Sequence, residues 1–249
     1  MNYDDCYQKS WGYNYNAQPI RAMRYRFVKR ALAEVIGQSS IKRTLDVGCG
    51  IGEIAKFIFD LGKDVDVTGI DMSGKAIELA KSNCPDIAFF ISDLESFKDK
   101  ECYDLITAID VIEHIENDRL ALQKISHLLQ DSGILVLSLP HNMRYWTKSD
   151  ESGGHYRRYS KAEIVEKLKE ADFTIVKLRS YGFPFPILYL YLKNWLSKSC
   201  RYSEDELLKN PKRITRITAL FMKYLFFTCE IDIGLGLHLL IIAKKVLHG

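Results

Sequence analysis

Short apolar runs alternate with amphipathic stretches along most of this chain. The apolar runs lie near residues 43–48, 65–71, 88–93, 103–110 and 133–140, and stretches with helical spacing lie near 52–61, 73–82, 117–130 and 160–170. Strands that alternate with helices predict a parallel sheet with right-handed crossovers. We interpret residues 173–182 as a sixth strand and 235–246 as a seventh, antiparallel one. The predicted fold is therefore α/β: a doubly wound, Rossmann-like, mostly parallel sheet of seven strands.

Length and composition agree with a single domain over residues 1–249. The chain has 249 residues, of which 47% are hydrophobic, enough to bury a full core within one α/β domain. We expect residues 1–40 to form an N-terminal helical cap, with an amphipathic helix from about Pro19 to Ile36. Five aromatic residues precede that helix, and they either close over a ligand or pack outside the sheet: Tyr3, Tyr7, Trp11, Tyr13 and Tyr15.

Three glycines at alternate positions follow the first predicted strand. Gly48, Gly50 and Gly52 can adopt backbone angles that a Cβ would forbid, and they let a ligand lie against the main chain. The dinucleotide fingerprint G-x-G-x-x-G would place a third glycine where this chain has Glu53, whose carboxylate would repel a pyrophosphate. Asp46 adds a negative charge at the end of the strand. The turn therefore predicts a ligand with positive charge, although a purely structural strand-to-helix turn has a similar sequence.

Two further predicted strands also end in acids. Asp71 follows the second strand and Asp93 the third, and ligands of open α/β sheets bind at the carboxyl ends of the strands. Asp71 can accept hydrogen bonds from two ribose hydroxyls, or it can simply start a turn.

An acid followed by G-x-G-x-G, with these later acids, resembles motif I and the following motifs of class I S-adenosylmethionine methyltransferases. The resemblance covers roughly residues 40–180 and is greatest to the ubiquinone-biosynthesis-like, small-molecule subgroup. It implies S-adenosylmethionine as cofactor and no metal. It also implies that Asp71 binds the ribose, that Met72 lies against the adenine, and that Asp93 accepts from the adenine amino group. The cofactor-binding residues that we predict are Asp46, Gly48, Cys49, Gly50, Gly52, Asp71, Met72, Asp93, Leu94 and Ile109.

Three histidines are candidates for an acceptor-side base, since histidine is best matched to proton transfer at neutral pH. We rank His155 first, His114 second and His141 third. His155 begins a segment that resembles the H-x-R-x-Y-S segment of bacterial methyltransferases of this subgroup. His114 can instead pack in the cofactor pocket, and His141 can cap its strand.

The same segment supplies candidates for substrate binding. These are Tyr156, Arg157 and Tyr159, together with Trp11 from the N-terminal region. An arginine fork suits a carboxylate or phosphate. We expect one of Arg157 and Arg158 to bind an acid and the other to face solvent, with salt bridges to acidic helix starts as the alternative.

A long segment separates the last two predicted strands. Residues 183–234 are rich in aromatic side chains, and between Lys193 and Lys223 they carry eight basic residues against three acids. No uncharged apolar run reaches the roughly 18 residues of a spanning helix. We expect a helical insertion that acts as a lid, a dimer surface or a contact with an anionic membrane, two extra core helices being the alternative. A lid with this composition predicts a lipid-like substrate with a sizeable apolar part.

Charge and cysteine usage narrow the function further. A net charge of +3 gives no support for a general nucleic-acid surface. The six cysteines form no C-x-x-C pair, and the N-terminus shows no signal peptide, which favours a cytoplasmic protein with peripheral contact at the inner membrane face as an option. The sequence thus predicts an S-adenosylmethionine-dependent methyltransferase of a small molecule, with an O-, C- or N-acceptor. The alternatives are an RNA or protein methyltransferase, a noncatalytic S-adenosylmethionine-binding protein and, disfavoured by Glu53, a nicotinamide oxidoreductase. Oligomeric state is left open.

Overall fold

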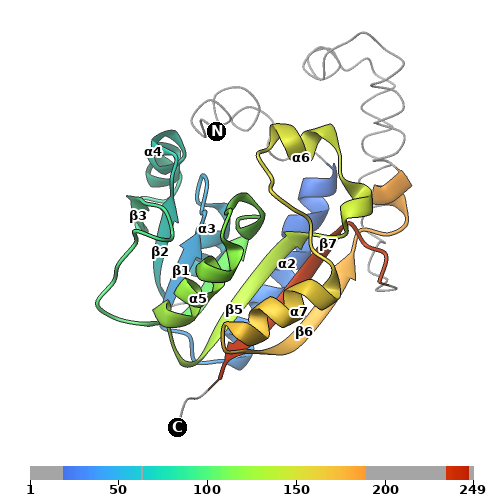
Figure 1. The fold of residues 1–249 in the computed structure, drawn as a ribbon. Helices are drawn as coiled ribbons and strands as arrows, with labels where there is room; N and C mark the ends of the chain where they lie inside the picture. Colours follow the sequence, from blue (N-terminus) through green and yellow to red (C-terminus); the bar gives the residue numbers. More distant parts are fainter. Residues whose placement is uncertain (1–18, 63, 189–233, 247–249) are drawn as a thin grey trace, which may run out of the picture.

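The computed structural model describes residues 19–62, 64–188 and 234–246, which form one seven-stranded sheet with helices on both faces (Figure 1). The strands are β1 (Arg43–Val47), β2 (Asp66–Asp71), β3 (Ala88–Ile91), β4 (Tyr103–Ile109), β5 (Leu129–Pro140), β6 (Phe173–Tyr181) and β7 (His238–Lys245). The helices are α2 (Pro19–Gln38), α3 (Glu53–Leu61), α4 (Gly74–Asn83), α5 (Asp118–Leu128), α6 (Lys148–Ser152) and α7 (Lys161–Glu170), with short 3-10 turns η3 (Ile112–His114) and η4 (Met143–Tyr145).

The strand order is β3-β2-β1-β4-β5-β7-β6. Strands β1 to β5 pair in parallel with their neighbours, whereas β7 lies between β5 and β6 and is antiparallel to both. The predicted doubly wound sheet with an antiparallel last strand is confirmed. Because β1, β2 and β4 are parallel, their carboxyl ends meet at one edge of the sheet.

Each face of the sheet carries its own hydrophobic core. Helices α2, α3 and α4 cover one face, where Leu32, Ile58 and Ile77 are buried. Helices α5 and α7 cover the other face with Leu122, Ile125 and Leu168. The helices begin where the sequence offers caps: Ser73 accepts from the backbone N–H of Ala76, and Asn117 accepts from that of Leu120.

The fifth strand starts earlier than its apolar run predicts. Helix α5 ends at Leu128 and β5 begins at once at Leu129, although the sequence favoured a helix to residue 130 and a strand only from 133. The register against β4 jumps between the pairs Tyr103↔Leu129 and Leu105↔Ile134. A bulge with Ser132 at φ 63° interrupts the strand, so the polar residues that looked like a loop lie within a distorted strand.

Much of both predicted appendages lies outside the described residues. A helix over Pro19–Gln38 agrees with the helix expected in the cap, whereas Trp11 and the other aromatic residues before it are not described. Of the 183–234 segment, the structure describes only its two ends, with residues 185–188 helical. Within the described ranges, no helix has the length and apolarity needed to cross a bilayer.

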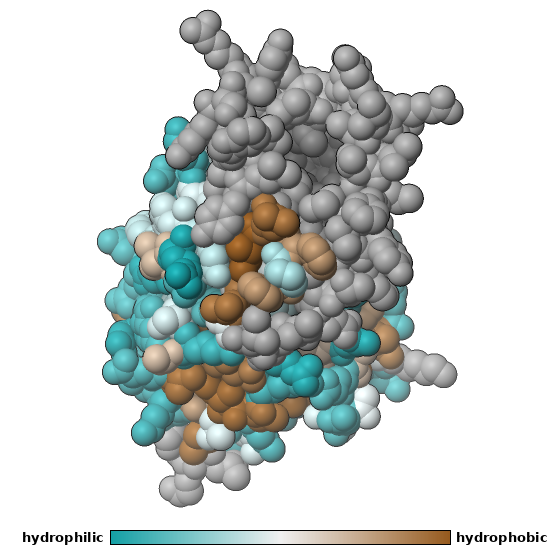
Figure 2. Space-filling view, turned by 90° about the vertical axis from the view of Figure 1, so that its right-hand side faces the viewer, coloured by the Kyte–Doolittle hydropathy of each residue, from teal (hydrophilic) through white to brown (hydrophobic). Residues whose placement is uncertain are grey.

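Exposed apolar residues occur at both described ends of that segment. Leu188 and Leu235 are among the exposed large hydrophobic residues of the protein. Figure 2 shows hydrophobic surface on this side of the molecule, next to the residues drawn in grey.

The two-core architecture predicts a stability contrast within one helix. Leu122 of α5 is completely buried, whereas Leu120, two residues away, is 57% exposed. Leu122→Ala should lower the free energy of unfolding by about 2–5 kcal/mol, because it leaves a cavity in the core. Leu120→Ala should change it by less than about 0.5 kcal/mol. Urea unfolding followed by circular dichroism measures both values, and equal effects would contradict the core that we describe.

Candidate functional site

The glycine turn lies at the carboxyl end of β1 with all three glycines at positive φ. The φ angles are 65° at Gly48, 54° at Gly50 and 85° at Gly52, a region that side chains with a Cβ rarely occupy. A Cβ on Gly48 would stand 2.4 Å from Cγ2 of Val111, and one on Gly52 would stand 3.0 Å from the Phe89 ring. The turn therefore needs glycine both for its backbone angles and for its close packing.

Asp71 at the end of β2 holds this turn in place. One carboxylate oxygen accepts from the Gly50 backbone N–H at 2.9 Å, and the other accepts from the Ser73 N–H at 2.9 Å. A carboxylate has about four lone-pair sites, so these two bonds leave acceptor capacity. Asp71 is thus both the start of a turn and an acceptor suited to a pair of hydroxyls.

A shallow hollow lies beside Asp71, lined by Met72, Ile91, Ser92, Asp93 and Ser96. Met72 is 58% and Ile91 64% exposed, which leaves apolar surface for a flat ring to cover. Asp93 accepts from the backbone N–H and the hydroxyl of Ser96, and these bonds lower its pKa. Its carboxylate is therefore fixed and ionised at the rim. The Leu94 side chain turns away into the core.

Asp46 behaves differently from the expectation of an open negative charge. Its side chain is 2% exposed and accepts from the Thr107 hydroxyl at 2.6 Å. Burial raises the pKa of Asp46 to about 7. At neutral pH this acid is therefore partly protonated, and any direct contact with the cofactor stays a prediction. Cys49 is buried as well, and burial raises the pKa of its thiol well above the usual value, which suits a packing role.

The residue after β4 forms an ion pair that the sequence analysis did not find. Asp110, at φ 56°, lies 2.5 Å from the Arg24 guanidinium of α2 and also accepts from the Ser138 hydroxyl. Ser138 in turn shares a hydrogen bond with the Tyr181 hydroxyl. The signal was available, since the fourth strand also ends in an acid, but only its neighbour Ile109 was chosen. Ile109 is partly buried and packs against the core on the α2 side.

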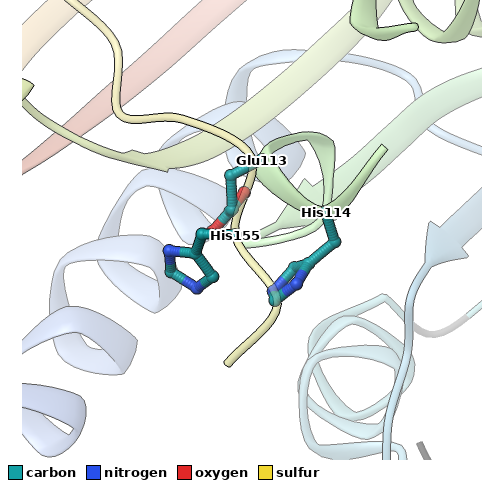
Figure 3. A group of neighbouring side chains, drawn as sticks. All are labelled: Glu113, His114 and His155. Atoms are coloured by element: carbon teal, nitrogen blue, oxygen red, sulfur yellow. The ribbon is translucent and has the colours of Figure 1, made fainter. Parts of the chain in front are cut away.

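His114 and His155, the two histidines that we rank highest, come together. Their ring centroids are 4.6 Å apart with the planes at 88°. Figure 3 shows Glu113 and His114 approaching from η3 and His155 from the segment after α6. One nitrogen or oxygen from each of these side chains lies within 4.8 Å of the others. Such a group could hold an ion, and the absence of a metal that the sequence predicts stays a prediction.

Their environments separate these groups chemically. Burial and the neighbouring His155 lower the pKa of His114 to about 4, so His114 is neutral at pH 7. Glu113 is completely buried, and neither carboxylate oxygen has a hydrogen-bond partner among the described residues. Burial, with the nearby Asp110, raises the pKa of Glu113 well above its usual value.

His141 does not join this pair. It is 4% exposed, and its Nδ1 lies 2.7 Å from the Gly236 carbonyl oxygen. Its backbone N–H donates to the Leu237 oxygen. These contacts tie the end of β5 to the start of β7, which favours the structural role over catalysis.

The segment after β5, residues 141–160, also differs from expectation at the arginines. Arg157 pairs with Asp118 at 2.8 Å and donates to the Glu116 carbonyl oxygen, whereas Arg158 forms a two-pronged pair with Asp150. The expected division between an acid-binding and a solvent-facing arginine is thus corrected, since both guanidinium groups bind carboxylates of the protein. The alternative of bridges to acidic helix starts describes them better.

The two tyrosines of this segment have opposite surroundings. Tyr159 is completely buried and donates to Asp118 at 3.0 Å, so its expected contact with a substrate does not agree with its position. Tyr156 is 54% exposed, and its backbone N–H donates to the Glu113 oxygen at 2.8 Å. Of the predicted substrate residues in the described part, Tyr156 alone presents most of its side chain to the surface.

The family model of a methyltransferase domain matches residues 15–178. This chain belongs to that methyltransferase family. A ubiquinone biosynthesis O-methyltransferase of Glaesserella parasuis is 27% identical over 65% of this chain and 76% of its own length. That of Haemophilus ducreyi is 25% identical over 77% of this chain and 89% of its own. A (S)-coclaurine N-methyltransferase of Papaver somniferum is 31% identical, but the match covers only 28% of that enzyme.

Solved structures agree with the fold. The N-methyltransferase NodS of Bradyrhizobium japonicum bound to S-adenosyl-L-homocysteine has a TM-score of 0.61 at 16% identity, with 98% of this chain and 99% of that chain covered. The [4+2]-cyclase SpnF also has a TM-score of 0.61, at 17% identity, with 89% and 80% covered. The protein is a methyltransferase that uses S-adenosylmethionine. Its glycine turn, its ribose-type acceptor Asp71 and its apolar hollow fit that cofactor.

The position of Asp71 predicts a loss of cofactor affinity on substitution. Asp71→Ala removes an acceptor for two hydroxyls and also the bonds that hold the glycine turn, so binding should weaken by about 2 kcal/mol, or roughly 30-fold. Asp66→Asn, at the other end of the same strand and 68% exposed, is the matched control and should bind normally. Calorimetry with S-adenosyl-L-homocysteine measures both. Unchanged affinity in Asp71→Ala would refute the ribose role.

Burial of Asp46 predicts a pH dependence of stability. Because its pKa is raised to about 7 from a model value of 3.8, the folded state holds this proton more tightly than the unfolded chain does. The resulting stabilisation is complete below about pH 4 and is lost as the pH rises through 7. Between pH 5 and 8 the wild type should lose about 3 kcal/mol relative to Asp46→Asn, which cannot titrate. Urea unfolding of both proteins across this range gives the difference, and parallel curves would contradict the raised pKa.

Proposed function

We propose that the protein methylates a small molecule with a sizeable apolar part, and that His155 accepts the proton of the acceptor group. The observation that carries the proposal is the pairing of His155 with His114 beside the cofactor turn. Val111, next to η3, would contact a Cβ on Gly48, so the histidine pair follows directly on the segment that packs against the glycines. This is the side on which an acceptor would meet an activated methyl group.

The reaction places few demands on the protein. S-adenosylmethionine supplies a methyl group that its sulfonium already activates. The protein then contributes orientation of the acceptor and exclusion of water. A base is needed when the acceptor carries a proton that must leave, as in a hydroxyl or an acidic carbon.

The surroundings favour His155 over His114 as that base. His114, with a pKa near 4, is a weak base at neutral pH, and its lowered proton affinity follows from burial. His155 lies 3.1 Å from the carboxylate of Asp150, and an adjacent anion favours the protonated form of an imidazole. The two rings therefore differ in kind: His155 can take a proton, while neutral His114 can pack against the reactants.

Exposed apolar side chains on the 141–160 segment support a substrate with an apolar part. Tyr156 and Met143 are each 54% exposed, close in sequence to His155 or to the end of β5. We propose that these side chains and the 183–234 segment cover such a substrate, and that the basic residues of the latter permit contact with an anionic membrane surface. The O- and N-methyltransferases among the relatives leave the acceptor atom open in the same way that the chemistry does.

Two other functions are disfavoured by particular observations. An RNA methyltransferase would be expected to have a strongly basic surface, and the net charge here is +3. The SpnF likeness shows that a cyclase can share this fold, so the fold alone does not establish methyl transfer to a given substrate. The direct test supplies isotopically labelled S-adenosylmethionine and a cell extract, and identifies which small molecule gains the label. Labelled RNA or protein instead would overturn the small-molecule proposal.

The base role predicts a separation of turnover from cofactor affinity. His155→Ala should lower turnover by about 10²- to 10⁴-fold, while affinity for S-adenosyl-L-homocysteine changes little because the proposed contact is with the acceptor. His127→Ala is the control, since His127 is an exposed histidine on α5. Steady-state kinetics with the labelled acceptor, together with calorimetry, measures both quantities. Near-normal turnover in His155→Ala would show that His155 is structural.

A further inference from the structure

A buried acid lies directly behind His155. Asp150 is 2% exposed and belongs to α6, a short helix of the 141–160 segment. We propose that Asp150 is a positioning residue that fixes the ring orientation and the tautomer of His155. This inference rests on the proposed function, because it explains how His155 is prepared to accept a proton.

Two contacts join these residues. Oδ1 of Asp150 lies 3.1 Å from Nδ1 of His155, and the backbone N–H of His155 donates to the Asp150 carbonyl oxygen at 3.0 Å. The chain makes this return through Gly153 and Gly154, the latter at φ 72°. A Cβ on Gly153 would be 2.9 Å from the Ser149 oxygen and 3.4 Å from the His155 ring. The turn thus brings the imidazole back against the carboxylate five residues earlier.

The carboxylate is itself held firmly. Arg158 donates to both of its oxygens at 3.0 Å, and Thr147 donates through its backbone N–H and its hydroxyl at 2.7 and 2.9 Å. Burial alone would favour the neutral acid. The contacts with His155, Arg158 and Thr147 outweigh burial and hold the pKa of Asp150 well below its usual range. Asp150 is therefore an oriented anion at neutral pH.

An anion at Nδ1 determines which ring nitrogen carries the proton. A carboxylate only accepts, so it selects the tautomer with hydrogen on Nδ1 and leaves the Nε2 lone pair free to act as a base. The other titratable side chains around the ring, Glu113 and His114, do not compete for this role, because their buried positions favour their neutral forms. His114 meets the His155 ring edge to face and limits its rotation from that side.

The arrangement accounts for each proton and bond in the transfer. As the acceptor oxygen or nitrogen bonds to the methyl carbon and the carbon–sulfur bond breaks, the acceptor's proton passes to Nε2 of His155. The imidazolium that results keeps its Nδ1–H toward Asp150, whose charge stabilises it. Asp150 itself need not take the proton.

The test uses Asp150→Asn in the full chain and reads out the tautomer as well as the rate. Nitrogen NMR of ¹⁵N-histidine-labelled protein, with His155 identified by the loss of its signals in His155→Gln, should show the wild-type proton on Nδ1. In Asp150→Asn we expect a mixed or reversed tautomer and a loss of turnover of about 10²-fold, with unchanged affinity for S-adenosyl-L-homocysteine.

Two control variants separate positioning from folding. Arg158→Gln breaks the other half of the same buried contact but keeps the carboxylate beside His155, so it should lower stability and retain the Nδ1–H tautomer. Glu151→Gln, exposed and next in sequence, should change neither property. A wild-type His155 proton on Nε2, or an unchanged tautomer and rate in folded Asp150→Asn, would overturn the inference. If His155→Ala keeps its turnover while the tautomer is as expected, the proposed base role fails but the positioning contact stands.

Discussion

The carboxyl edge of the sheet gathers acids in a region that excludes water, and the structure depends on how each of these charges is compensated. Asp71 receives two backbone N–H groups, Asp110 receives the Arg24 guanidinium, and Asp46 is compensated by a hydroxyl and by partial protonation. An uncompensated charge in such a place would cost several kcal/mol. The site is therefore preorganised chiefly by the donors that surround its acids.

The same rule orders the segment that carries His155. Asp118, at the start of α5, receives Arg157, Tyr159 and Lys167, and Asp150 receives Arg158 and Thr147. These two buried acids pin residues 141–160 against the α5 and α7 side of the sheet. Without them the histidine would stand on a polar loop with no fixed geometry. A methyl transfer that relies on alignment needs this rigidity more than it needs reactive side chains.

Local pattern predicted the sheet and the cofactor half of the site from the sequence. The glycine turn and the acids Asp71 and Asp93 follow their strands directly, so alternation and turn chemistry were enough to place them. The roles of Arg157 and Tyr159 were harder, because their common partner Asp118 lies some forty residues earlier in the chain. Arg24 reaches Asp110 over a still longer separation. Such pairings arise from tertiary packing, which a single sequence does not encode in any short motif.

The position of β7 between β5 and β6 has a further consequence for how this protein can diverge. Tyr181 at the end of β6 and His238 at the start of β7 are directly paired neighbours, so the long segment between them leaves and rejoins the sheet at one point. The entropy of closing such a loop grows only slowly, by about 0.6 kcal/mol for each doubling of its length. The segment can therefore be lengthened, shortened or exchanged between relatives without disturbing the strand register or the cofactor turn. Evolution can rebuild this part of the molecule as a replaceable module while the methyl-donor half stays the same.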